Sequence, residues 1–121
     1  MQSQDTAVSI VFNGEIYNYR ELRAELEPLG HRFVSGSDTE VLLAAWRQWG
    51  RACLPRLVGM FAFAVFDSAR GTLTCVRDAF GVKPFFYTRE QGSFLFASEV
   101  AAIKALKQER VQLDWQRAYD Y

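Results

Sequence analysis

The sequence is poor in the residues that build metal sites and disulfide frameworks. Among its 121 residues are one histidine, His31, and two cysteines, Cys53 and Cys75. Two distant cysteines supply neither a disulfide framework nor a four-ligand zinc site. We therefore expect no metal in this chain, and we expect both cysteines to be small core residues and His31 to lie at a helix exit or strand edge.

An excess of either charge is also missing, as is any long apolar run. Fourteen basic residues balance fourteen acidic ones. This balance argues against a nucleic-acid or anionic membrane partner. The start of the chain has no basic region followed by an apolar core, and no stretch is long enough to cross a bilayer. We expect a cytoplasmic protein that handles a small molecule.

What the chain has in quantity is apolar and aromatic residues. Half of the sequence is hydrophobic and 15% is aromatic. These values are typical of one globular domain, and neither a repeat nor a linker divides the chain. We therefore treat residues 1–121 as one unit.

The first third of the sequence predicts a strand followed by a helix. Apolar residues predict a strand over 7–12. Asn18 with Glu21 three residues later resembles a capping box, and Pro28 and Gly30 end the helix that it starts. The apolar face of this helix is expected to pack on a sheet.

A second strand and helix are predicted next. A short strand is expected over 32–34. Ser37 and Glu40 then repeat the capping pattern before an amphipathic helix over 41–49, which Gly50 closes.

The second half of the chain predicts mainly strands. Residues 60–66 are apolar at every position, as in a strand that is buried on both faces. Alternation and turn residues predict further strands over 72–77, 85–88 and 93–97 and a helix that begins near Ser98, whereas 107–121 are left unassigned. Helices and antiparallel strands in this order indicate an α+β fold.

Two polar segments stand out, Asn13–Asn18 and Ser35–Glu40. Each is predicted to join a strand to a helix. Together they offer an amide, backbone N–H groups and carboxylates, which are the groups that hold a small zwitterion. We expect the two segments to converge on one cavity sized for an amino acid.

These segments belong to a set that carries a family resemblance. The sequence resembles the glutaminase domain of asparagine synthetases, a class II glutamine amidotransferase domain of the N-terminal nucleophile hydrolase type. The resemblance implies an αββα sandwich, incomplete at its amino-terminal end in this chain. The matching segments, in the family's order, are Asn13–Asn18, Ser37–Glu40, Gly59–Phe63, Arg77–Asp78 with Gly81, Lys83 and Pro84, and Ala97–Glu99.

The resemblance also implies roles for four residues. In the family, the asparagine amide and the next N–H form an oxyanion hole, which gives Asn13 and Gly14 a catalytic role. Glu15 and Asp38 correspond to residues that hold the amino-acid end of glutamine.

Each role has a structural alternative. Asn-Gly is a common tight-turn dipeptide, Asp38 favours a helix amino terminus, and Glu15 suits a solvated turn. Arg77, Asp78 and Lys83 are expected to be structural, as an ion pair near a turn.

The chain also departs from the family. Family members begin with a cysteine whose thiol attacks glutamine, whereas this sequence begins Met1-Gln2. It lacks the early arginine that grips the glutamine carboxylate, and the ATP-binding synthetase domain, to which ATP and magnesium would belong. We therefore hypothesise a fragment that binds glutamine, needs the synthetase domain as its partner and is inactive alone.

Three further expectations stay open at this point. The chain could instead be a stand-alone, non-catalytic binding module of the same fold. A displaced nucleophile, Cys53 or Cys75, is a weaker alternative. Sheet edges left uncovered by missing strands favour a homo-oligomer.

Overall fold

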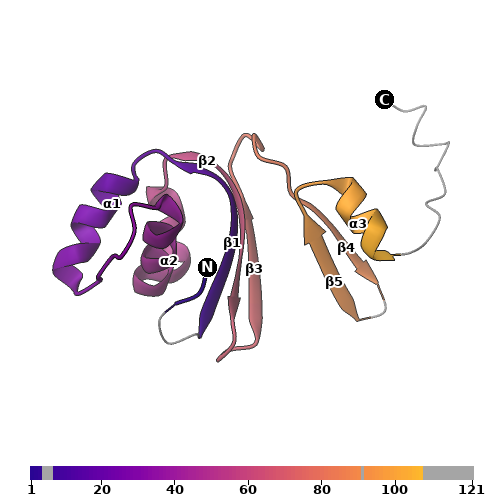
Figure 1. Ribbon diagram of the computed structural model, residues 1–121, viewed down its shortest axis with the longest axis horizontal. Helices are drawn as coiled ribbons and strands as arrows, with labels where there is room; N and C mark the ends of the chain where they lie inside the picture. The colour runs from indigo at the N-terminus through magenta and orange to yellow at the C-terminus, as the bar shows by residue number, and fades with distance from the viewer. Residues whose placement is uncertain (4–6, 91, 108–121) are drawn as a thin grey trace. The chain divides into compact units, whose positions relative to one another are not determined.

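Strand β2 (Gly59–Asp67) is the central strand of a three-stranded antiparallel sheet. Its neighbours are β1 (Val8–Ile16) and β3 (Thr72–Arg77), in the order β1-β2-β3 (Figure 1). The structure is a computed structural model that describes residues 1–3, 7–90 and 92–107. Every residue of β1 pairs with β2, from Val8 opposite Asp67 to Ile16 opposite Gly59.

The chain divides into two compact units, Met1–Pro84 and Phe85–Tyr121. The first unit holds this sheet, helices α1 (Tyr19–Leu26) and α2 (Asp38–Trp49) and two short 3₁₀ segments, η1 (Glu27–Leu29) and η2 (Gly50–Arg56). The second unit holds a hairpin of β4 (Phe86–Glu90) and β5 (Ser93–Ala97), followed by helix α3 (Val100–Lys107). The α+β prediction is confirmed.

Helix α2 covers one face of the three-stranded sheet through its contacts with β1, and α1 packs against α2 on the same side (Figure 1). Alternation along the strands turns Ile10 and Ile16 of β1 and Phe63 of β2 toward this face, where they join the core. The helices contribute Leu22, Leu26, Val41, Leu42 and Ala45 to the same cluster. Full burial of an apolar side chain such as Phe63 stabilises the fold by about 1.5–3 kcal/mol.

The prediction of a strand buried on both faces is confirmed for β2. Five consecutive residues, 61–65, are buried. On the face away from the helices, this burial depends on small side chains, Ala62 and Ala64. Larger side chains on that face are more exposed, such as Val11 at 59% and Leu73 at 41%.

The start of α1 differs from the predicted capping box. Asn18 precedes the helix and its carbonyl accepts the N–H of Leu22, as a first helical residue requires. Its side chain is engaged elsewhere: Nδ2 donates to the carbonyl of Arg56 at 2.9 Å, and Oδ1 accepts from the N–H of Val58 at 2.9 Å. The capping-box prediction is therefore wrong, because a long-range contact has taken the amide.

The end of α1 and both ends of α2 agree with the sequence. Gly30 adopts a left-handed conformation after η1, with φ 93°. Ser37 caps α2 by accepting the N–H of Thr39 at 3.1 Å. Gly50 closes that helix, with φ 55°.

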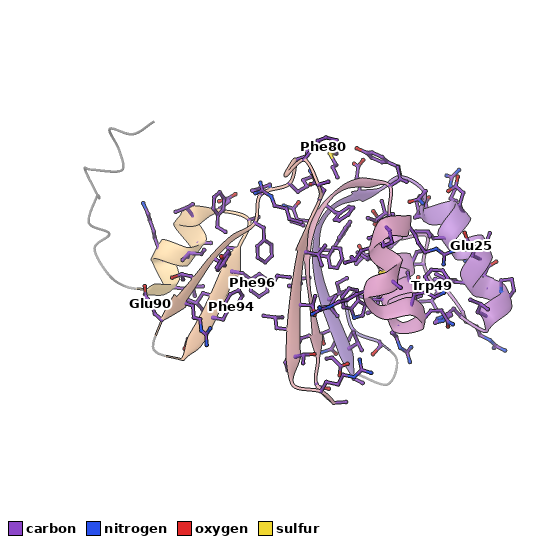
Figure 2. All side chains as sticks on the ribbon, turned by 180° about the vertical axis from the view of Figure 1, so that it is seen from behind. Glu25, Trp49, Phe80, Glu90, Phe94 and Phe96 are labelled. Carbon is purple, nitrogen blue, oxygen red and sulfur yellow. The ribbon has the colours of Figure 1, made fainter. Side chains whose placement is uncertain are left out.

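The second unit is a hairpin whose aromatic side chains stack along one face. Phe94 lies 5.6 Å from Tyr87 and 6.2 Å from Phe96 between ring centroids, and Phe96 lies 5.4 Å from Phe85. Phe94 and Phe96 are labelled in Figure 2. Both predicted strands and the start of the last helix are confirmed, whereas 108–121, which include most of the unassigned tail, lie outside the described residues.

Two glycines allow β1 and β2 to approach closely at one end of the sheet. A Cβ on Gly14 would collide with the carbonyl oxygen of Met60, and a Cβ on Gly59 would collide with that of Glu15. Gly14 also has φ 148°, which L residues rarely adopt. The pairing of β1 with β2 at this end of the sheet therefore depends on glycine at both position 14 and position 59.

We expect Gly59→Ala to lower the free energy of unfolding by about 1–3 kcal/mol, because the added methyl group must displace backbone. Gly36→Ala is the matched control, since nothing lies within 4 Å of a Cβ there. Urea unfolding followed by circular dichroism measures both. Equal stability of the two variants would contradict the close approach.

Candidate functional site

The first polar segment lies inside a strand, so its prediction as a strand-to-helix turn is wrong. Asn13 through Ile16 belong to β1, and the turn itself is Tyr17-Asn18. The ladder with β2 continues to Ile16 because glycines at positions 14 and 59 let the strands pair there. Alternation then puts the side chains of Asn13 and Glu15 on the face away from the helices, where both are exposed.

The outer edge of β1 carries the N–H groups of its even-numbered residues. Ile10 donates its N–H to the carbonyl of Met1 at 2.8 Å, and Ile16 donates its N–H to Oδ2 of Asp38 at 3.0 Å. In contrast, Tyr17 donates to Val58 on the β2 side. Because N–H directions alternate along an antiparallel strand, Gly14 directs its N–H to the same outer edge as Ile16.

Asp38 is the residue that brings the second polar segment to this edge. It is the first residue of α2, directly after the N-cap Ser37. Its Oδ2 accepts from the N–H of Ile16, and its Oδ1 accepts from Oγ1 of Thr39 at 3.4 Å. Ile16 lies two residues after Gly14, a spacing of roughly 7 Å along a strand. The Asp38 carboxylate therefore contacts β1 roughly 7 Å along the strand from the Gly14 N–H.

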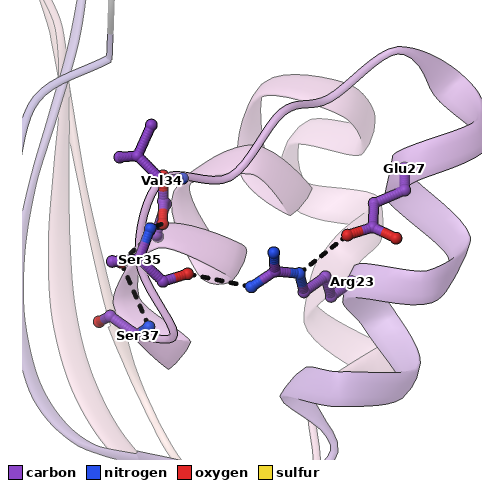
Figure 3. A network of polar contacts seen from close by, with 6 residues as sticks. Arg23, Glu27, Val34, Ser35 and Ser37 are labelled. Atoms are coloured by element: carbon purple, nitrogen blue, oxygen red, sulfur yellow. Dashed lines mark hydrogen bonds and ion pairs between the residues drawn. The ribbon is translucent and has the colours of Figure 1, made fainter.

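The loop before α2 is held by side chains, and the strand predicted over 32–34 is wrong. Glu40 accepts the N–H groups of Val34 and Ser35 at 2.9 and 2.8 Å and the hydroxyl of Ser35 at 2.6 Å, so a carboxylate takes the place of a neighbouring strand. Arg23 of α1 donates to the Ser35 carbonyl at 3.0 Å and pairs with Glu27 (Figure 3). Two helices thus fix the loop that leads to Asp38.

These contacts change the pKa of the Glu40 carboxyl. Partial burial raises it, but the hydrogen bonds from the Ser35 hydroxyl and from the N–H groups of Val34 and Ser35 outweigh burial and lower the pKa below its ordinary value. The loop is therefore held by an ionised carboxylate at neutral pH.

Asp78, which follows β3, also holds a loop by accepting backbone N–H groups with its carboxylate. Its carboxylate accepts four backbone N–H groups, those of Phe61, Phe80, Val82 and Lys83, at 3.0–3.2 Å. The bond from Val82 is the largest cause that lowers the pKa of Asp78, and burial opposes it. Because Phe61 is the residue opposite Gly14, Asp78 ties the Gly14 region to the loop after β3.

Arg77 completes that loop by donating to the carbonyls of Lys83 and Gly81, both at 2.7 Å. The structural interpretation of Arg77, Asp78 and Lys83 is thereby supported. The Arg77 and Asp78 side chains bond to backbone atoms, however, and Lys83 takes part through its backbone N–H and carbonyl, so a backbone network stands where an ion pair was expected.

The two cysteines offer little as nucleophiles. Cys53 is fully buried, and this burial raises the pKa of its thiol to about 11. Cys75 is exposed on β3, so its prediction as a core residue is wrong, although burial of part of its side chain still raises the pKa of the thiol. Cys75 pairs with Ala64 of β2, whereas Asn13 pairs with Ala62, so Cys75 is not directly across from Asn13 in the sheet.

Two cavities of about 390 and 930 Å³ lie elsewhere in the first unit. Among the described residues that line them, none is Asn13, Gly14, Glu15 or Asp38. The smaller cavity lies beside the 30–35 loop and includes His31, which bonds to Gln48. A closed pocket around the four candidate residues therefore stays a prediction, although the structure does bring Asp38 to β1.

The described part of the chain has neither a metal-binding cluster nor a membrane-spanning helix. Residues 1–3, 7–90 and 92–107 contain no group of three or more His, Cys, Asp and Glu residues placed to hold a metal ion. Over the same ranges, no helix has the length and apolarity that crossing a membrane requires.

Comparison with known proteins identifies the class. The family model for the glutamine amidotransferase domain matches residues 1–121. The chain therefore belongs to the glutamine amidotransferase domain family.

Within that family the chain is similar to asparagine synthetases, as the sequence motifs indicated. It is 50% identical over 106 residues to asparagine synthetase [glutamine-hydrolyzing] 3 of Bacillus subtilis (strain 168), covering 88% of this chain and 17% of that protein. Asparagine synthetase [glutamine-hydrolyzing] 1 of the same organism is 42% identical over 118 residues, covering 98% and 18%. The chain spans less than a fifth of these relatives.

A solved structure supports the fold. The glutamine phosphoribosylpyrophosphate amidotransferase of B. subtilis, complexed with ADP and GMP, matches with a TM-score of 0.73 at 25% identity, over 88% of this chain and 25% of that one. The predicted N-terminal nucleophile hydrolase-like fold is confirmed by this likeness.

Sequence reasoning missed the roles of Asn18, Gly59 and Asp78. All three fall in segments that match the family, but nothing in their residue types shows their partners. Asn18 bonds to residues 38 and 40 positions away, and Asp78 bonds both to Phe61, 17 positions away, and to three N–H groups of the loop directly after it. The paired glycines are the one usable signal, because a glycine within an apolar strand indicates close backbone approach.

We expect Asp78→Asn to destabilise the protein at neutral pH, because an amide replaces one of the two accepting oxygens with a donor. The pKa of Asp78 is lower in the folded protein than its ordinary value of 3.8, so its contribution is present above that value and is lost as pH falls through the folded pKa. The stability difference between variant and unchanged protein should therefore shrink in acid.

Thermal unfolding at a series of pH values from neutral to strongly acidic measures this difference. Glu21→Gln, in the exposed first turn of α1, is the control. A difference that stays constant across the series would contradict the role of the Asp78 carboxylate.

Proposed function

We propose that this chain is the glutamine-binding and oxyanion-stabilising part of a longer, glutamine-hydrolysing enzyme of the asparagine synthetase kind. The observation that carries the proposal is the bond between Asp38 and Ile16, because it joins the two family motifs at one end of β1. In this proposal, a synthetase domain outside the chain receives the ammonia.

Gly14 and Asn13 are the proposed oxyanion donors. The Gly14 N–H points to the outer edge of β1, and the Asn13 side chain stands exposed on the adjacent strand face. When a nucleophile attacks the carboxamide of glutamine, the carbonyl oxygen becomes negative, and two fixed donors stabilise it more than they stabilise the neutral carbonyl. A strand backbone fixes such donors better than a mobile loop does.

Asp38 is the proposed partner of the substrate ammonium. Its carboxylate is oriented by the Ile16 N–H and by the helix start, which leaves it acceptor capacity for a charged donor. Glu15 lies on the exposed face beside Asn13 and is proposed to assist. The Gly14 N–H and the Ile16 N–H, which holds Asp38, lie roughly 7 Å apart along β1. This spacing suits a ligand with a carboxamide at one end and an ammonium at the other.

Binding of L-glutamine to the chain tests the proposal. We expect L-glutamine to shift the amide resonances of Gly14 and Ile16 in ¹⁵N-edited spectra, and L-glutamate, which lacks the carboxamide, to bind more weakly. Asp38→Asn keeps an oxygen for the Ile16 N–H but removes the charge, so affinity for L-glutamine should fall about tenfold or more.

Asp67→Asn is the matched control for this substitution, because Asp67 lies at the opposite end of β1 and β2. It should leave the affinity unchanged. Equal affinity of Asp38→Asn and the unchanged chain would remove Asp38 from the site.

The oxyanion role has a separate test. An amino acid that carries a tetrahedral sulfonamide in place of the glutamine carboxamide resembles the intermediate. Asn13→Ala should weaken binding of this sulfonamide about tenfold or more while changing glutamine affinity far less, because the donor acts mainly on the tetrahedral state. Calorimetric titration measures both, and equal losses would mean that Asn13 serves ground-state binding only.

A further inference from the structure

Asn18 occupies an unusual position between the two strands of the proposed site. It lies two residues after the end of β1, and its side chain reaches the segment that leads into β2. The amide donates to the Arg56 carbonyl and accepts from the Val58 N–H, so both of its ends are used on two residues that flank Leu57.

We propose that Asn18 is a positioning residue that sets the direction of the Gly14 N–H through β2. It does not touch substrate in this proposal, which rests on the proposed function above. The chain of contacts runs from Asn18 to Val58, from there to Gly59, and across the ladder to β1.

The first step of this chain is the fixed position of residues 56–58. Arg56 itself is anchored, because its guanidinium stacks 3.9 Å over the Trp49 ring and pairs with Glu25. Trp49 and Glu25 are labelled in Figure 2. The carbonyl that Asn18 contacts is therefore attached to both α1 and α2, and the amide joins this anchored residue to β1.

The second step is the transfer from Val58 to Gly14. Val58 accepts the Tyr17 N–H at 2.7 Å, which closes the ladder beyond Ile16. Gly59 and Gly14 both lie against the backbone of the opposite strand, with no side chain between. A shift of residue 58 is therefore passed to the β1 backbone rather than absorbed by a flexible side chain.

The chemistry of the amide makes the arrangement specific. A carboxylate at this position keeps the acceptor for Val58 but sets a negative oxygen against the Arg56 carbonyl, and alanine removes both bonds. An oxyanion donor requires accurate direction, whereas the ammonium held by Asp38 is attracted over a longer range. Loss of Asn18 should consequently affect the tetrahedral state more than the bound substrate.

The experiment compares Asn18→Ala and Asn18→Asp with Glu21→Gln, an exposed residue one turn further on. In ligand-free spectra, both Asn18 variants should shift the Gly14 amide. Asn18→Ala, which removes the acceptor of the Val58 N–H, should also speed hydrogen exchange of Val58, while the control does neither. With ligands, Asn18→Ala should weaken the sulfonamide about tenfold and glutamine twofold or less, since small misplacements cost mainly transition-state contacts.

A merely structural Asn18 predicts a different pattern. Stability would fall, but the ratio of the two affinities would stay that of the unchanged chain, and this result would overturn the proposal. An unmoved Gly14 resonance would overturn it as well. If the unchanged chain does not prefer the sulfonamide to glutamine, the oxyanion function itself fails, and the ligand-free spectra still decide whether Asn18 positions Gly14.

Discussion

The hydrogen bond from the Ile16 N–H to the Asp38 carboxylate is the contact on which the proposed site depends. It attaches the start of α2 to the outer edge of β1. The two polar segments are thereby joined through residues that are 22 positions apart in the sequence. Glu40, Ser35 and Arg23 hold the intervening loop, which keeps the carboxylate in place before any ligand arrives. A site preorganised in this way does not have to order itself at the moment of reaction.

The second constraint on the proposed site is the direct contact between the backbones of β1 and β2 at Gly14 and Gly59, with no side chain between them. Gly14 and Gly59 let β1 and β2 approach, and two polar side chains fix β2 around this point: Asn18 before Gly59 and Asp78 at Phe61. Each of these side chains uses its polar atoms on backbone groups. The motif residues thus build the geometry around the proposed donor as well as supplying the donor.

Much of this could be predicted from the sequence, and the rest depends on side-chain contacts with backbone groups, which residue types alone do not reveal. Hydrophobic alternation, turn residues and Ser37 predicted the helices and most strands, because these signals act locally. The capping role of Asn18 was wrong because Val58, 40 residues further along the chain, took its side-chain oxygen. The strand over 32–34 was wrong because a nearby side chain, that of Glu40, took the N–H groups of Val34 and Ser35. Family motifs identified the candidate residues, but only the structure shows Asn13 and Gly14 within a strand.

A structure of this chain with L-glutamine bound tests the account most directly. The account predicts the carboxamide oxygen within hydrogen-bonding distance of the Gly14 N–H and the Asn13 amide, with the ammonium facing Asp38. Glutamine bound with its ammonium at the Gly14 end, or bound in either of the two cavities on the rest of the first unit, would contradict it.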